Sequence, residues 1–313
     1  MKRATKAVNL GLVALVCFFF GTGFAHADNL FVSNGPSNTI EEFNSSGVGT
    51  TFTSSGLSDP YGLAFDSAGN LYVANYVGNN IEEFKSSGGV LSSNGTVFAS
   101  SGVQGPTGLA FDNSGNLYVA NYGTNEVYTI EKFNSSGVGT VFANSELNGP
   151  IDLAFDSAGN LYVGNYWNNT IERFNSSGVG TFFTSSGPSA PEGLAFDRAG
   201  NLYITTDYYT RITQINPNGA ERIFASSGLS SPEGLAFDSS GNLYVANEGT
   251  GTSGNGYIEE FDTNGVGTVF ASLGVADSPG LAFQPVPEPA TWALLTLGVC
   301  TLLGGRHLRR GSS

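Results

Sequence analysis

One fourteen-residue segment, repeated at intervals of 41 to 46 residues, constrains the fold of this chain more than any other feature. Residues 62–75 read Gly-Leu-Ala-Phe-Asp-Ser-Ala-Gly-Asn-Leu-Tyr-Val-Ala-Asn. The copies occupy residues 62–75, 108–121, 152–165, 193–206 and 234–247. The second half of the segment stands alone at residues 29–34, and the first half stands alone at residues 280–283. Each half therefore occurs six times, which is typical of a repeat array.

Each copy predicts a β-hairpin. The runs at residues 63–65 and 71–73 are short, apolar and bounded by turn residues, and the Asp-Ser-Ala-Gly-Asn stretch between them favours a tight reversal. A third strand is expected at residues 81–84 and a fourth at residues 96–99. Four antiparallel strands per repeat, six repeats and no helical periodicity predict an all-β fold, a six-bladed β-propeller of four-stranded antiparallel blades.

The two half-segments predict how the ring closes. The first repeat lacks its opening strand and the last repeat consists of that strand alone, so residues 280–283 should pair with residues 30–33. Gln284 stands where every other copy has Asp, which is consistent with the absence of a turn after this strand. The closing blade is therefore expected to contain both the amino- and the carboxy-terminal strand of the domain.

The amino-terminal end has the pattern of a secretory signal peptide at residues 1–27. Three basic residues at positions 2–6 precede an apolar run at residues 10–24 and a small-residue cleavage site before Asp28. A long amino-terminal anchor is the alternative, but the apolar run is short for a bilayer.

The carboxy-terminal end has a second targeting pattern. Pro287, Glu288 and Pro289 precede an apolar stretch at residues 290–305 and a basic tail at 306–310. This order resembles the PEP-CTERM sorting signal of Gram-negative bacteria. The resemblance implies recognition by an exosortase-type membrane protease, transient membrane anchoring and delivery to the cell surface or extracellular matrix. Sixteen helical residues rise about 24 Å against a hydrocarbon core of about 30 Å, so the span is marginal, and a permanent anchor is the alternative.

The single domain between these ends, residues 28–286, is strongly acidic. It carries six basic and 25 acidic side chains, a formal charge of −19. Such a surface disfavours nucleic acid and anionic membranes, and both simple solubility and a cation-binding surface would explain it. Cys17, Cys300, His26 and His307 all lie in the terminal segments, so the domain has no disulfide, thiol or imidazole.

The repeated segment also resembles the NHL repeat. Residues 60–62, 69–75 and 80–84 follow that family's Pro-x-Gly, Gly-Asn-apolar-Tyr-Val and Ile-x-x-Phe patterns. The resemblance extends over residues 28–284 and implies a six-bladed propeller. It leaves function open, because such propellers bind proteins, RNA or glycans, or are hydrolases and lyases.

Strand direction predicts which residues share a rim of the propeller. The Pro-x-Gly start of the first strand and the Asn end of the second strand fall on one rim, and the Asp-x-x-Gly turns fall on the other. The x position is assigned to Tyr61, Thr107, Asp152, Glu192 and Glu233. The strand-end position is filled by Asn34, Asn75, Asn121, Asn165, Thr206 and Asn247. Aromatic residues follow directly: Tyr76, Tyr122, Tyr166, Trp167, Tyr208 and Tyr209.

Each of these features has a structural explanation beside a functional one. The turn aspartates are explained by the turn itself. The strand-end asparagines would serve as loop caps or contact a ligand, and the aromatic residues would cover the rim or contact a ligand. The predicted ligand-binding rim consists of Tyr61, Tyr76, Asn121, Tyr122, Asn165, Tyr166, Trp167, Tyr208 and Asn247.

A cation site is also predicted at Asp152, Glu192 and Glu233. These residues come from three consecutive repeats and bring like charges toward one channel mouth. Either one carboxyl group is protonated or a cation lies between them. Because only oxygen ligands are available, Ca²⁺ is the expected ion.

Two functional classes follow. The first is an exported, non-catalytic cell-surface or matrix protein whose rim binds an exopolysaccharide or another protein. The second is a metal-dependent hydrolase or lyase similar to the gluconolactonase and streptogramin-lyase families, in which one of the three carboxylates would be the base. The uniformity of the repeats favours the first class, because an active site breaks the symmetry. Residues 284–289 are expected to leave from the Asp-turn rim, so that the aromatic rim faces outward.

Overall fold

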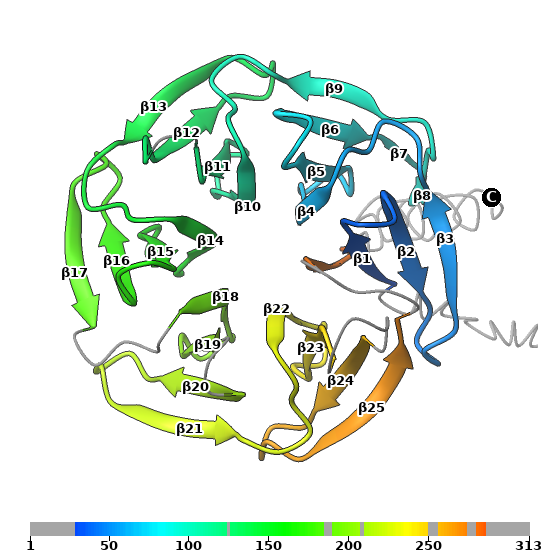
Figure 1. The fold of residues 1–313 in the computed structure, drawn as a ribbon, viewed down its shortest axis with the longest axis vertical. Helices are drawn as coiled ribbons and strands as arrows, with labels where there is room; N and C mark the ends of the chain where they lie inside the picture. Colours follow the sequence, from blue (N-terminus) through cyan, green and yellow to red (C-terminus); the bar gives the residue numbers. More distant parts are fainter. Residues whose placement is uncertain are drawn as a thin grey trace, which may run out of the picture.

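The computed structural model describes residues 29–123, 126–184, 190–206, 210–249, 256–273 and 280–285. Within these ranges the chain forms six four-stranded antiparallel sheets and contains no helix. The sheets are arranged around a central axis as the blades of a six-bladed β-propeller (Figure 1), which confirms the predicted fold class. The predicted signal peptide, the Pro287-Glu288-Pro289 motif and the apolar stretch 290–305 lie outside the described residues. In the described part of the chain, no helix is long and apolar enough to cross a membrane.

Each blade is built from four strands that run from the centre of the ring to its edge. Blade 1 contains β26 (Leu281–Phe283), β1 (Leu30–Asn34), β2 (Thr39–Phe43) and β3 (Gly49–Thr53). Blade 2 contains β4 (Pro60–Phe65), β5 (Leu71–Asn75), β6 (Asn80–Phe84) and β9 (Thr96–Ala99). Blade 3 contains β10 (Pro106–Phe111), β11 (Leu117–Asn121), β12 (Thr129–Phe133) and β13 (Gly139–Ala143).

The remaining three blades follow the same plan. Blade 4 contains β14 (Pro150–Phe155), β15 (Leu161–Asn165), β16 (Thr170–Phe174) and β17 (Gly180–Thr184). Blade 5 contains β18 (Pro191–Phe196), β19 (Leu202–Thr206), β20 (Arg211–Ile215) and β21 (Glu221–Ala225). Blade 6 contains β22 (Pro232–Phe237), β23 (Leu243–Asn247), β24 (Tyr257–Phe261) and β25 (Gly267–Ser272).

The ring closes as the two half-segments predicted. Strand β26 pairs antiparallel with β1, with Leu30 opposite Phe283 and Val32 opposite Leu281. The Ser33 amide donates to the Gly280 carbonyl at 3.1 Å, which extends the pairing beyond the strand. Both terminal strands of the domain therefore belong to one blade.

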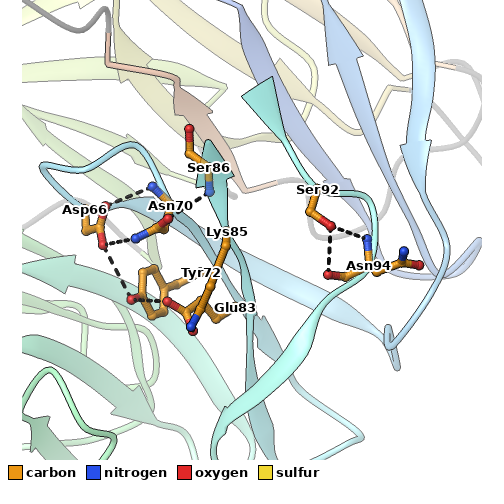
Figure 2. A network of polar contacts seen from close by, with 8 residues as sticks. All are labelled: Asp66, Asn70, Tyr72, Glu83, Lys85, Ser86, Ser92 and Asn94. Atoms are coloured by element: carbon orange, nitrogen blue, oxygen red, sulfur yellow. Dashed lines mark hydrogen bonds and ion pairs between the residues drawn. The ribbon is translucent and has the colours of Figure 1, made fainter. Parts of the chain in front are cut away.

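The Asp-x-x-Gly turns have the structural role expected of them. Asp66 Oδ1 accepts the amides of Ala68 and Asn70, each at 2.9 Å, and Asp66 Oδ2 accepts the Asn70 side chain at 2.7 Å (Figure 2). Gly69 completes the turn with a φ of 82°, a conformation that costs glycine little. Equivalent bonds occur at Asp112, Asp156, Asp197 and Asp238.

The hydrophobic core lies between adjacent blades. In blades 2 to 6 the tyrosine of the second strand contacts one Phe of the outer strand and one Phe of the next blade's inner strand. Tyr72, for example, meets Phe98 and Phe111 edge to face, with ring centroids 5.0 Å apart in both pairs. At the closure, Tyr244 of blade 6 meets Phe283 of β26 at 4.9 Å. The same packing therefore recurs around the ring, as expected for a repeat protein.

An insertion in blade 2 covers the closure of the ring. Residues 85–94 form a small hairpin from β7 (Ser86–Ser87) and β8 (Val90–Leu91). The Gln284 side chain donates to the Gly89 carbonyl at 3.1 Å, and the Thr53 hydroxyl donates to the Ser93 carbonyl at 2.8 Å. This hairpin therefore contacts both the residue after β26 and the outer strand of blade 1.

Candidate functional site

Residues from the innermost strand of every blade line a cavity at the centre of the ring. Tyr61, Asp152, Glu192 and Glu233 share it with Ile151 and with leucines and glycines of the same strands. Its volume is about 50 Å³, which is room for a few water molecules but not for an organic substrate. The structure thus brings four of the five predicted x-position residues into one cavity. Thr107 is completely buried and is not part of it.

Asp152 does not occupy the x position of Pro-x-Gly, which corrects the sequence assignment. The register places it opposite Gly164 and directly before Leu153, so it stands at the glycine position and Ile151 stands at x. Glycine is usual there because the next blade approaches closely. A Cβ on Gly62 would lie 2.1 Å from the Thr107 carbonyl oxygen. Blade 4 is therefore the one departure from this rule among the copies of the repeat that begin at residues 62, 108, 152, 193 and 234.

The Asp152 carboxylate fastens blade 4 to blade 5. Oδ1 accepts the Leu153 amide and Oδ2 accepts the Leu194 amide, both at 2.8 Å. Burial raises the pKa of Asp152 to about 7, and the two amide bonds act against that rise. Other blades use hydroxyl groups for the same purpose, because Ser33 donates to the Tyr61 carbonyl at 2.5 Å. Thr107 and Thr205 make equivalent bonds to the carbonyls of Pro150 and Glu233.

The donor set around the cavity does not fit a bound metal ion. Both carboxylate oxygens of Asp152 are occupied by backbone amides. In the described ranges, no group of three or more His, Cys, Asp or Glu side chains is arranged to hold a metal. The Ca²⁺ site at Asp152, Glu192 and Glu233 gains no support from the geometry and stays a prediction.

The strand-end asparagines are loop caps, which corrects their inclusion in the ligand-binding rim. Asn121, Asn165 and Asn247 are at most 2% exposed. Asn121 Oδ1 accepts the Gln104 amide at 3.0 Å, and Nδ2 donates to the Gly102 carbonyl at 2.8 Å. The amide oxygens of the other two likewise accept backbone N–H groups of the loop that leads into their blade. These side chains are used inside the protein and have no surface for a ligand.

The aromatic residues of the predicted rim form one continuous row, here called the aromatic arc, across blades 2, 3 and 4. Consecutive ring centroids lie 6.4 Å apart for Tyr61 and Tyr76, 6.3 Å for Tyr76 and Tyr122, 6.3 Å for Tyr122 and Trp167, and 4.9 Å for Trp167 and Tyr166. Tyr208, also predicted for this rim, lies outside the described residues.

Sequence reasoning missed one member of the arc. Tyr128 belongs to the insertion between the second and third strands of blade 3, and its ring lies 6.2 Å from that of Tyr122. The repeat pattern gave it no position, because an insertion has no counterpart in the other blades. An aromatic residue in an insertion that follows a rim tyrosine was the available signal.

Backbone bonds hold the arc in register. Tyr122 and Tyr166 each follow the last residue of a second strand, and their amides donate to the carbonyls of Gly105 at 3.0 Å and Gly149 at 2.9 Å. Gly149 has a φ of 67°, and a Cβ there would lie 2.3 Å from the Trp167 ring. The indole therefore rests on a glycine, with 56% of its surface exposed, and its N–H is hydrogen-bonded to the Tyr122 hydroxyl.

The arc and the cavity meet at two places. Tyr61 belongs to both, and the negative charge of Glu192, a cavity residue, acts on the Tyr122 hydroxyl. Burial is the main reason why the pKa of Tyr122 is raised; the Trp167 bond opposes the rise, and the Glu192 charge adds to it. Glu192 is therefore an acidic group at the inner edge of the aromatic row.

Basic side chains lie away from the arc. Lys132 pairs with Asp112 of a turn at 3.4 Å, and Lys85 pairs with Glu83 at 3.6 Å, both toward the Asp-turn rim. Arg173, Arg198 and Arg222 also belong to the ends of strands or turns on that side. Arg211 begins β20 on the rim of the arc, but in blade 5. The rim of blades 2 to 4 is thus polar, aromatic and acidic.

A set of buried glutamates was not predicted from the sequence. Glu82, Glu131, Glu172 and Glu259 each lie in a third strand and are buried. Desolvation raises the pKa of all four, that of Glu259 to about 7. They lie outside the central cavity, and they affect stability rather than the candidate site.

The comparisons with known proteins give structural neighbours and no family. No protein-family model and no curated protein matches this chain. A streptogramin B lyase has a TM-score of 0.60 at 15% identity over 78% of this chain and 79% of its own. A catalytically inactive histidine-to-alanine variant of virginiamycin B lyase from Staphylococcus aureus, with quinupristin, has a TM-score of 0.58 at 15% identity over 83% and 94%.

A third neighbour belongs to the lactonases. A gluconolactonase from Xanthomonas campestris has a TM-score of 0.55 at 20% identity over 67% of this chain and 75% of its own. At these identities the similarity shows a shared fold. The chain is a six-bladed propeller whose structural neighbours are of the streptogramin-lyase and gluconolactonase type.

Proposed function

We propose that this protein is an exported surface protein that binds a glycan through the aromatic arc. The observation that carries the proposal is the continuous row of Tyr and Trp rings on one rim, with Trp167 more than half exposed. Each ring offers a flat apolar face and a polar group at its edge, which is the combination that a sugar ring needs for stacking and hydrogen bonding.

The shape of the arc favours a chain-like ligand over a protein. A specific protein interface covers about 800 Å² on each partner, and its apolar centre is broad. The arc is a single row of rings across three blades, and its immediate neighbours are buried asparagines and loop backbone. A linear glycan can place successive sugars along such a row.

A second candidate function is hydrolysis or elimination at the central cavity, because the structural neighbours are lyases and a gluconolactonase. The lyase from Staphylococcus aureus is inactive when a histidine is replaced by alanine, whereas residues 28–286 of this chain contain no histidine. A carboxylate such as Glu192 or Glu233 would have to act as the base. The small cavity and the donor set that does not fit a metal favour binding over this alternative.

Surface attachment belongs to the proposal as well. Phe283, the last residue of β26, lies opposite Leu30 at the level of the Asp-turn rim. A tether that continues from Gln284 would leave the propeller on that side. If an exosortase-type protease handles residues 287–313, the arc would face away from the membrane during sorting.

The test is binding of the purified protein to soluble polysaccharides by titration calorimetry. Trp167→Ala and Tyr76→Ala should each weaken binding about tenfold, which corresponds to a stacking contribution of about 1.4 kcal/mol. Ser67→Ala and Ser157→Ala, both on exposed turns of the opposite rim, are the matched controls and should change nothing. Weaker binding in the serine variants alone would show that the working face is the opposite rim.

A parallel assay separates the second candidate. Lactone hydrolysis is measured with and without Ca²⁺ for the unmodified protein and for Glu192→Gln. Turnover that depends on Glu192, with no polysaccharide binding, would replace the binding proposal with the enzymatic one. Capture of a purified surface protein that competes for Trp167 would replace the glycan with a protein partner.

A further inference from the structure

We infer that the aromatic arc, together with Glu192, selects a glycan that carries amino groups over neutral and acidic glycans. The ligand class is a cationic polysaccharide with unacetylated amino sugars. This inference rests on the proposed function, because it names the chemical class that the same rim would take.

The first argument is the position of the acidic group. Glu192 lines the central cavity and is near enough to Tyr122 for its charge to act on the phenol. Glu233 lines the same cavity from the next blade, and Tyr61 joins the cavity to the arc. An ammonium group on a sugar that stacks on the arc would therefore lie between ring faces and a carboxylate. Cation–π attraction and charge–charge attraction then act on the same atom.

The second argument is the size of the cavity. With about 50 Å³ of room, it admits water or a small charged group but no sugar ring. The glycan would stay on the rim, and its amino group would reach the cavity mouth. A neutral hydroxyl at that point would gain a hydrogen bond at most, whereas an ammonium group would form a charge-assisted one.

The third argument is the placement of positive charge. An acidic polysaccharide would need basic side chains to neutralise it, but Lys85, Lys132 and Arg222 lie toward the Asp-turn rim, and Arg211 lies in blade 5. The domain as a whole has a formal charge of −19 between residues 28 and 286. The field of the protein therefore repels polyanions and attracts polycations at low salt.

The experiment compares three oligosaccharides of equal length: fully acetylated chito-oligosaccharide, its deacetylated form and oligogalacturonate. Binding of each to the purified full chain is measured by calorimetry at low and at physiological salt, at a pH where the amino groups are protonated. The deacetylated form should bind about tenfold more tightly than the acetylated form, and oligogalacturonate should bind most weakly. Trp167→Ala should weaken binding of both chito-oligosaccharides.

Two charge variants test the role of Glu192. Glu192→Gln should reduce the preference for the deacetylated form to about twofold or less and leave binding of the acetylated form unchanged. Glu192→Asp should keep the preference, which guards against a folding defect in the first variant. Glu221→Gln removes an equal charge from an exposed position at the start of β21 and is the matched control.

The outcomes are distinct. Equal binding of both chito-oligosaccharides, still sensitive to Trp167→Ala, would overturn the charge selection and leave the proposed function standing. A preference that falls equally in Glu192→Gln and Glu221→Gln would show that net charge, not the arc, makes the selection. No binding of any of the three sugars, by any variant, would count against the proposed function itself.

Discussion

At the scale of single residues, buried carboxyl groups dominate the chemistry of this propeller. Glu82, Glu131, Glu172 and Glu259 would face solvent in a strand with ordinary alternation. Each lies next to a β-bulge instead, for example between Ile81 and Glu82 in the pairing of β6 with β9. A bulge interrupts the alternation, so that two consecutive side chains are buried.

These carboxyl groups predict how stability depends on pH. Burial raises the pKa of Glu259 and of Asp152 from ordinary values of 4.5 and 3.8 to about 7 in each case. The folded state therefore holds protons that the unfolded state has released, and stability falls as pH rises from about 4 through about 7. Asp112 and Asp262, whose pKa values are lowered, act in the opposite direction at more acidic pH.

Glu259→Gln isolates one of these groups. At pH 8 the substitution should increase the free energy of unfolding by about 2 kcal/mol, because it removes a charge that is costly to bury. Near pH 4 it should change the stability little. Urea denaturation at both pH values is the measurement, with Glu260→Gln, one residue away and partly exposed, as the control. A variant that is equally stabilised at both pH values would contradict the assignment.

At the scale of elements, much could be predicted because each strand repeats its own signal. The hairpins, the Asp-x-x-Gly turns and the closure by β26 follow from a segment that occurs again and again. Insertions carry no such signal, so neither the β7–β8 hairpin nor Tyr128 had a predicted place. Asp152 was placed one position away in the ring, because its departure from glycine hid the alignment that the register shows.

The candidate site was less predictable than the fold for a physical reason. Strand direction correctly brought Tyr61, Tyr76, Tyr122 and Trp167 to one rim. It could not tell exposed side chains from buried ones at that rim. Asn121 lies beside the arc, but its amide is used by the neighbouring loop.

The closing strand gives a prediction at this scale. Deletion of residues 280–285 should remove β26, including the Phe283 ring that packs on Tyr244, and leave β1 as an open edge. An open, apolar edge strand favours association, so the shortened chain should melt at a lower temperature and aggregate. Thermal melting combined with light scattering tests this. Melting and scattering like those of the full chain would show that β26 does not close the ring.

At the scale of the whole molecule, the two rims differ in character. One rim is made of repeated turns that fold the blades, and the residues that leave the propeller after β26 start there. The other rim carries the aromatic arc, which spans three neighbouring blades without repeating in all six. A departure from sixfold symmetry on one rim is what a binding surface on a repeat scaffold requires.

The central claim is that the arc is the surface that binds the ligand, and Trp167 can report on it directly. The chain contains two tryptophans, Trp167 and Trp292, and the second lies outside the propeller. In a Trp292→Phe variant, fluorescence comes from Trp167 alone. Titration with deacetylated chito-oligosaccharide should then produce a saturable change in its emission, with the same midpoint as the calorimetric titration. Calorimetric binding with unchanged Trp167 emission would contradict the account.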